Sequence, residues 1–196
     1  MKKHPKYAEI SGKRYLINTS YLIAIECQEI ALNEEIGDYE RALAIIYKLF
    51  GEDGLNDKEN HVELLNIAKK FLCCGQEIEE NNDDFDMDFI EDFDYIKTSF
   101  FSDYKIDLDK TDMHWHQFYN LLNGLSNSEF GNCCILNRIR NIRTMDTSDI
   151  KDKKRLEEIK KAKKQFELKR NKKKKIYTKQ QLESMDKFYS RLEGGE

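Results

Sequence analysis

Two histidines flank the only tryptophan of the chain in the stretch "MHWHQFYNLLNGL" (113–125), a combination that suits either a metal site or a protein core. Imidazoles are common zinc ligands, and on a β-strand His114 and His116 would share one face. The apolar residues that follow recur at helical spacing instead: Trp115, Phe118, Tyr119 and Leu122. Because residues two apart on a helix point about 200° from each other, we expect the two histidines to diverge and predict no metal site.

The cysteines form a second candidate set of metal ligands: Cys27, Cys73, Cys74, Cys133 and Cys134. Zinc sites commonly separate two cysteines by two to four residues so that both sulfurs can turn inward, and adjacent cysteines do this badly. We therefore expect each adjacent pair to lie within a helix as small buried side chains. The N-terminus lacks the apolar segment of a secretory signal, so we expect reduced thiols and no disulfides.

Carboxylates dominate the middle of the chain: Asp83, Asp84, Asp86, Asp88, Glu91, Asp92 and Asp94. This order lacks the D-x-D-x-D-G pattern of a calcium-binding loop and its glycine at the sixth position. We predict a charged, solvated connector whose first part, about 76–84, is a mobile acidic loop. Basic residues predominate from Arg138 onward, and such asymmetry can guide docking within the chain or assembly with a partner.

The basic stretch 148–175 is the strongest sequence argument for nucleic-acid binding, since clustered lysines can displace counterions from phosphates. The candidate residues are Lys160, Lys164, Lys172, Lys173, Lys174 and Lys175. Glutamates are interspersed among them and the formal net charge is −4, so a solvated helix face is the favoured interpretation. A nucleic-acid-associated protein acting through a basic helix at 148–175 remains the alternative function.

No motif for catalysis is present. The sequence contains no glycine-rich phosphate loop, no G-x-S-x-G and no nucleophile beside a base motif, so we predict no catalytic residues, no cofactor and no enzyme activity. It also contains no run of eighteen apolar residues, which argues against a membrane span. We expect the protein to stay in the cytosol.

The elements that must position these residues are mostly helices, because the chain has a single proline and only nine glycines, too few for an all-β protein. Residues 7–18 have β-favouring segments around Ser11-Gly12 and predict a small hairpin. Thr19 or Ser20 can cap the first helix, and Gly51 can end the second. We predict a mainly α fold, with a compact helical domain and N-terminal β-hairpin over 1–168 and a basic helical C-terminal extension over 169–196.

Several stretches together resemble the bacteriophage "Gp-fifteen" family, encoded in the tail-morphogenesis modules of phages and prophages of Gram-positive bacteria. They are, in order, "EISGKRYLINTSYLIAIE", "FLCCG", "DFDYIKTSFFSDYKIDL", "HWHQFYNLLNGL", "ILNRIRNI" and a Ser-Asp-Ile-Lys-Asp-Lys stretch leading to "FEL", and they cover about residues 9–168. The family typically has a second tryptophan where this chain has His116, which indicates an aromatic packing position rather than a ligand.

Members of this family resemble tail assembly chaperones, and the resemblance implies a non-catalytic protein of the bacterial cytoplasm that binds the tape measure protein and helps tail tube subunits assemble. The sequence leaves open whether the protein also associates with copies of itself. A tape measure exposes long amphipathic helices, which an apolar groove on a helical partner could cover. The aromatic residues that we expect to supply partner-facing surface are Tyr95, Phe100, Phe101, Tyr104, Trp115 and Phe118. The alternative is that all of them are buried.

Overall fold

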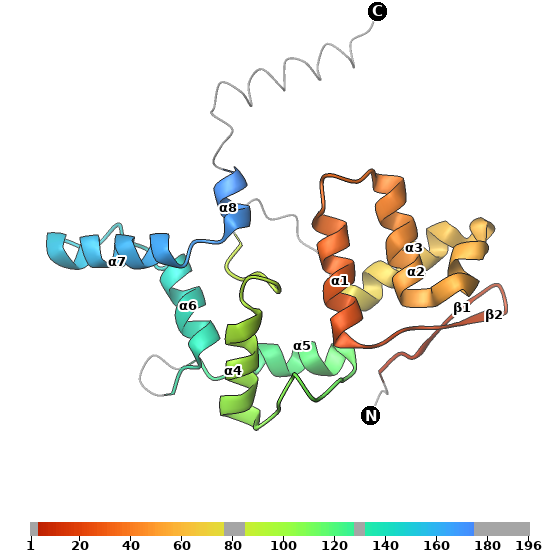
Figure 1. Cartoon of the computed structure of the whole chain (residues 1–196), viewed down its shortest axis with the longest axis horizontal. Helices are drawn as coiled ribbons and strands as arrows, with labels where there is room; N and C mark the ends of the chain where they lie inside the picture. The colour runs from red at the N-terminus through yellow and green to blue at the C-terminus, as the bar shows by residue number, and fades with distance from the viewer. Residues whose placement is uncertain (1–3, 77–84, 128–131, 175–196) are drawn as a thin grey trace, which may run out of the picture. The chain divides into compact units, whose positions relative to one another are not determined.

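The computed structural model describes residues 4–76, 85–127 and 132–174. Within these ranges the chain is mainly helical with one N-terminal antiparallel hairpin, which confirms the predicted fold class (Figure 1). The elements are β1 (Tyr7–Ile10), β2 (Lys13–Leu16), α1 (Tyr21–Leu32), α2 (Asp38–Asn56), the 3-10 turn η1 (Lys58–Asn60), α3 (His61–Leu72), α4 (Phe93–Tyr104), α5 (Trp115–Asn123), α6 (Ile135–Thr144), α7 (Lys153–Gln165) and α8 (Lys169–Lys174).

The contacts divide the chain into two units. Unit 1 contains residues 1–81 and 96–126, and unit 2 contains 82–95 and 127–196, so the boundary falls inside α4. Of the predicted mobile acidic loop at 76–84, only Gln76 lies within the described residues. The predicted extension from 169 onward stays a prediction, because its residues from 175 on lie outside the described ranges.

The hairpin forms where the sequence predicts it. Ser11 and Gly12 both have positive φ, 50° and 80°, as a type I′ turn requires, and Tyr7 pairs with Leu16 at the open end. Tyr15 is buried and donates its hydroxyl hydrogen to the Asp57 carboxylate at 2.6 Å, and Lys13 donates to the same oxygen at 2.6 Å. These hydrogen bonds lower the pKa of Asp57 to about 2 and fix the hairpin to the end of α2.

The helices α1, α2 and α3 follow the hairpin and pack against one another in unit 1. Ser20 caps α1, as expected, because its hydroxyl accepts from the Leu22 amide at 3.3 Å. Gly51 was predicted to end the second helix. It has φ 67° and breaks the helical path there, but the chain then resumes a helix to Asn56. The buried apolar side chains between these helices include Ile46, Leu49, Leu64 and Ala68.

The basic stretch in unit 2 forms two helices instead of the single helix predicted over 148–175. Asp152 caps α7 by accepting from the amides of Lys154 and Arg155. The break before α8 has a physical cause, because Leu168 is buried and the Phe166 carbonyl accepts from the Arg143 guanidinium at 2.6 Å. None of the helices in the described ranges combines the length and apolar character that a membrane span needs.

Candidate partner-binding surface

Three of the six aromatic residues predicted to face a partner are core residues. Trp115, Phe100 and Phe118 each have an exposed fraction of 0%. The prediction is therefore wrong for these three, because a fully buried side chain cannot line a surface of the folded protein. The sequence could not distinguish the two cases, since a stripe of aromatic residues at helical spacing suits both a core and an interface.

The buried aromatic rings stack on one another within unit 1. The Phe118 ring stacks on Tyr21 at 4.6 Å between centroids, on Phe100 at 5.0 Å and on Trp115 at 5.7 Å. The indole nitrogen of Trp115 donates to the Leu72 carbonyl at 2.9 Å, so its one polar atom is satisfied. This cluster joins α1, α4 and α5, and the opening stretch of the sequence analysis is thus a packing helix.

The other three residues that were predicted to face a partner differ in how exposed their side chains are. Phe101 is 58% exposed, whereas Tyr95 and Tyr104 are half-buried, and the Tyr104 hydroxyl donates to the Leu121 carbonyl at 2.9 Å. Their contact with a partner stays a prediction. Phe101 is the one residue of the predicted set whose ring is largely open to solvent.

Other exposed apolar side chains lie on α1, on α2 and in the short loop between them. Among the described residues, five exposed large apolar side chains lie within 22–47: Leu22, Leu32, Ile36, Tyr39 and Tyr47. We call these five residues the hairpin surface. Exposed large apolar side chains on a protein surface are candidates for an interaction site.

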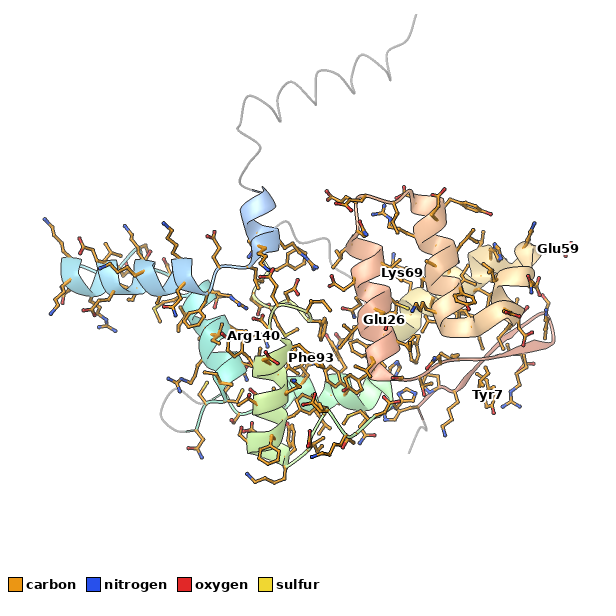
Figure 2. All side chains as sticks on the ribbon, viewed as in Figure 1. Tyr7, Glu26, Glu59, Lys69, Phe93 and Arg140 are labelled. Carbon is orange, nitrogen blue, oxygen red and sulfur yellow. The ribbon has the colours of Figure 1, made fainter. Side chains whose placement is uncertain are left out.

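The composition of α1 explains why it cannot bury all of its apolar side chains. Its sequence, "YLIAIECQEIAL", starts with five apolar residues in succession, so apolar groups lie on every side of the helix. Tyr21, Ala24 and Ile25 face the core, which leaves Leu22 outward. Glu26 also lies on the exposed side, where its carboxylate accepts from Lys48 of α2 at 2.5 Å (Figure 2). That run of apolar residues was the sequence signal for the surface.

Acidic residues border the hairpin surface. From Tyr21 to Arg41 the sequence has one basic residue, Arg41, and the following acidic residues: Glu26, Glu29, Glu34, Glu35, Asp38 and Glu40. Arg41 itself donates to the Asp38 carboxylate. Exposed apolar side chains interspersed with carboxylates complement an amphipathic helix that has an apolar face flanked by lysine or arginine.

The two histidines of the opening stretch do not diverge, which corrects the prediction from helical phase. His114 is the N-cap of α5 and has an extended backbone (φ −61°, ψ 134°), so the helix begins only at Trp115. The His114 and His116 rings consequently lie 5.2 Å apart between centroids. Nε2 of His114 donates to the Pro5 carbonyl, and Nε2 of His116 donates to the Phe71 carbonyl, both at 2.9 Å. Burial lowers the pKa of both imidazoles.

Two of the acidic residues after position 84 are buried, which corrects the prediction of a solvated connector, whereas Glu91 and Asp94 are exposed. Asp88 and Asp92 are buried in unit 2, where Asp92 accepts both terminal guanidinium nitrogens of Arg143, at 2.6 and 2.8 Å. Asp88 pairs with Arg170 at 3.0 Å, and Asp86 pairs with Arg140 at 2.7 Å. The carboxylates therefore neutralise arginines of the basic C-terminal half, and this docking within the chain uses the charge asymmetry seen in the sequence.

The adjacent cysteines lie at the ends of helices in the described residues. Cys134 is the N-cap of α6, its sulfur accepting from the Asn137 amide, while Cys73 and Cys74 follow the end of α3. The prediction that each pair lies within a helix is therefore wrong. Burial raises the pKa of Cys27 to about 12 and that of Cys74 to about 11, so both thiols stay protonated at neutral pH.

The candidate nucleic-acid residues are only partly described. Lys160 and Lys164 are exposed on α7, whose side chains extend from both sides of the ribbon in Figure 2. Lys172, Lys173 and Lys174 belong to α8, and Lys175 lies outside the described residues. Glu157 and Glu158 are exposed among the lysines of α7, so its surface carries both signs of charge.

We expect the protein not to bind nucleic acid tightly at physiological salt, because the mixed charges of α7 offer few uninterrupted phosphate contacts. A gel-shift titration with double- and single-stranded DNA and with RNA measures this directly. Tight binding that weakens steeply with added salt, and that a Lys160→Gln, Lys164→Gln double variant reduces, would instead support the nucleic-acid alternative.

The comparisons with known proteins give one match. The family model described as Bacteriophage Gp15 protein matches residues 2–168 of the 196-residue chain. This range contains both the hairpin surface and the buried aromatic cluster. No curated protein and no solved structure matches the chain.

Proposed function

Because this chain belongs to the bacteriophage Gp15 family, we propose that it is a non-catalytic tail morphogenesis factor: a tail assembly chaperone that binds the tape measure protein in the bacterial cytoplasm. The observation that supports this proposal is the hairpin surface, where apolar side chains of α1 and α2 stay exposed. A chaperone for a long helical protein needs such a surface, since the exposed apolar face of each client helix must be covered until the tail tube encloses it.

The size of the hairpin surface fits one segment of a helix. The 12 residues of α1 span about 18 Å at 1.5 Å per residue, which matches about three turns of a client helix. An apolar face of three turns presents client residues at i, i+3, i+4 and i+7, the usual anchors for a helix in a groove. A single contact of this size is weak and reversible, which suits a factor that must release its client to the assembling tube.

The acidic border of the hairpin surface gives the contact a preferred charge. Glu34 and Glu35 are exposed in the loop between α1 and α2, next to Ile36. Client segments that carry lysine or arginine beside their apolar face should bind faster than acidic ones, and added salt should slow their association. Recruitment of tail tube subunits belongs to the same proposed role.

Co-expression tests the proposed function. The chain is produced together with the large helical protein encoded beside it, with a tag on that partner only. We expect the partner to stay soluble and to retain the chain through affinity purification, whereas the partner expressed alone precipitates. If the partner precipitates equally in both cases, or is soluble and recovers none of this chain, the chaperone proposal is wrong.

A further inference from the structure

Three of the four histidines of the chain meet in unit 1, although one comes from the N-terminal segment and two from the start of α5. They are His4, His114 and His116, and one ring nitrogen from each lies within 4.8 Å of the others. The centroid of the His4 ring is 4.8 Å from that of His114 and 5.7 Å from that of His116. We propose that these three imidazoles bind one transition-metal ion of the class Zn²⁺, Co²⁺ or Ni²⁺.

A hydrogen bond orients the His116 ring so that its other nitrogen is available to bind a metal ion. Its Nε2 donates to the Phe71 carbonyl at 2.9 Å, so that nitrogen carries the proton and the lone pair is on Nδ1. Metal-binding histidines usually donate their second nitrogen to a backbone carbonyl in this way, which fixes the tautomer and the orientation of the ring. The Phe71 ring stacks on His116 at 5.0 Å and holds it further in place.

The His114 ring is oriented in the same way, by a hydrogen bond to a different backbone carbonyl. Its Nε2 donates to the Pro5 carbonyl at 2.9 Å, which again leaves the lone pair on Nδ1. That Nδ1 accepts the His116 amide at 3.1 Å as the cap of α5. A metal ion would replace this single capping hydrogen bond with a stronger metal–nitrogen bond, and the amide at the helix start would then turn to water.

His4 supplies the third nitrogen and is the ligand that can move. Its side chain is exposed, so it can rotate without disturbing the core. Tetrahedral coordination at about 2.0–2.1 Å places ligand nitrogens about 3.3 Å apart, closer than the 4.8 Å within which one ring nitrogen of each histidine lies, so the imidazoles have to move toward one another. Water completes the coordination.

The proposed ion would fasten the segment before β1 to the junction of α3 and α5. The Pro5 carbonyl and the Phe71 carbonyl already receive hydrogen bonds from the two α5 histidines, so the ligands and their supports come from the same three parts of unit 1. An ion that binds the folded chain more tightly than the unfolded chain raises the melting temperature in proportion to the logarithm of its concentration.

Titration of the full chain with Co²⁺ and Ni²⁺ tests the site. The protein must be free of any polyhistidine tag, and the readouts are calorimetric binding, the visible absorption of bound Co²⁺ and the melting temperature. We expect one ion per chain, a rise in melting temperature on saturation, and a Co²⁺ spectrum without the ultraviolet charge-transfer band of thiolate ligands, which separates this site from the cysteines.

Histidine variants give the matched comparison. His4→Ala removes an exposed side chain and should leave the fold intact while weakening metal binding about tenfold or more. His116→Ala should also weaken metal binding, and His61→Ala serves as the control because its imidazole bonds the Leu55 carbonyl outside the cluster. The proposal is wrong if no saturable binding occurs, or if His4→Ala binds metal as tightly as His61→Ala.

Discussion

Trp115→Ala is expected to lower the free energy of unfolding by about 3–5 kcal/mol, the usual cost of removing a large aromatic side chain from a core. The residue is fully buried, and its ring stacks on Phe118 at 5.7 Å and contacts Tyr119 at 5.6 Å. The substitution also leaves the Leu72 carbonyl without the indole donor that it accepts from at 2.9 Å. Urea unfolding followed by circular dichroism measures the change, because the variant has no tryptophan to report fluorescence.

Phe101→Ala is the control for this prediction. Both residues were predicted from sequence to face a partner, but Phe101 is 58% exposed, and its loss should change the free energy of unfolding by no more than about 0.5 kcal/mol. Equal destabilisation by the two substitutions would mean that Trp115 does not occupy the core position described above.

Asp92→Ala is expected to destabilise unit 2 by about 3–5 kcal/mol, because it leaves the Arg143 guanidinium buried without its counterion. The side chains of Arg143 and Asp92 are only 9% and 1% exposed, and two hydrogen bonds join them. Asp92 also accepts from the Asp88 amide at 3.0 Å, so the turn before α4 loses an acceptor as well. Thermal unfolding followed by circular dichroism should show the loss as an earlier transition.

Asp86→Ala provides the comparison within the same unit. Asp86 pairs with Arg140 at 2.7 Å, but its side chain is 41% exposed, so water replaces much of what the pair contributes and the expected cost is about 1 kcal/mol or less. A result in which Asp86→Ala is as damaging as Asp92→Ala would contradict the assignment of Asp92 as the buried counterion.

The local features of the fold were predictable from the sequence because each depends on residues close together in the chain. Ser11-Gly12 adopts the positive φ values of a tight hairpin turn, Ser20 caps α1, and the stripe from Trp115 to Leu122 forms the buried side of α5. Turn chemistry predicts the first feature, helix capping predicts the second, and the apolar period of a helix predicts the third.

The sequence-based predictions that were wrong concern residues whose contacts lie far away in the sequence. Asp92 looked solvated because its neighbours are acidic, yet its counterion is Arg143, 51 residues away. His114 and His116 were predicted to point apart because both were assigned to a helix, but His114 is the N-cap and lies before the helix begins. The carbonyls that accept their hydrogen bonds belong to Pro5 and Phe71, in other parts of the chain. The short-range periodicity of apolar residues does not show which distant residues will pair.

Three of the residues predicted for the partner-binding site proved to be core residues, for a related reason. The sequence showed an excess of aromatic residues around Phe100 and Trp115, but the mutual stacking of those rings with Tyr21 buries them. The run of apolar residues that begins α1 includes Leu22, whose side chain is exposed. Exposed apolar area depends on which face the neighbouring helices cover, and that is a property of the tertiary structure.

The most direct test of the central claim is retention of the tape measure protein by a chain whose hairpin surface has been made polar. The triple variant Leu22→Gln, Leu32→Gln, Tyr39→Gln removes three exposed apolar side chains and replaces them with a residue that suits helices. Val62→Gln is the matched control, since Val62 is even more exposed but lies on α3, outside the hairpin surface. Circular dichroism and the melting temperature must first show that both variants fold like the parent chain.

Each apolar side chain buried against a client should contribute about 1–2 kcal/mol, so the triple variant should bind the tape measure protein at least about 100-fold more weakly. The measurement is the amount of chain recovered with tagged tape measure protein after co-expression. We predict near-complete loss of recovery for the triple variant and parent-like recovery for Val62→Gln. Parent-like recovery of the triple variant would contradict the claim that the hairpin surface holds the client.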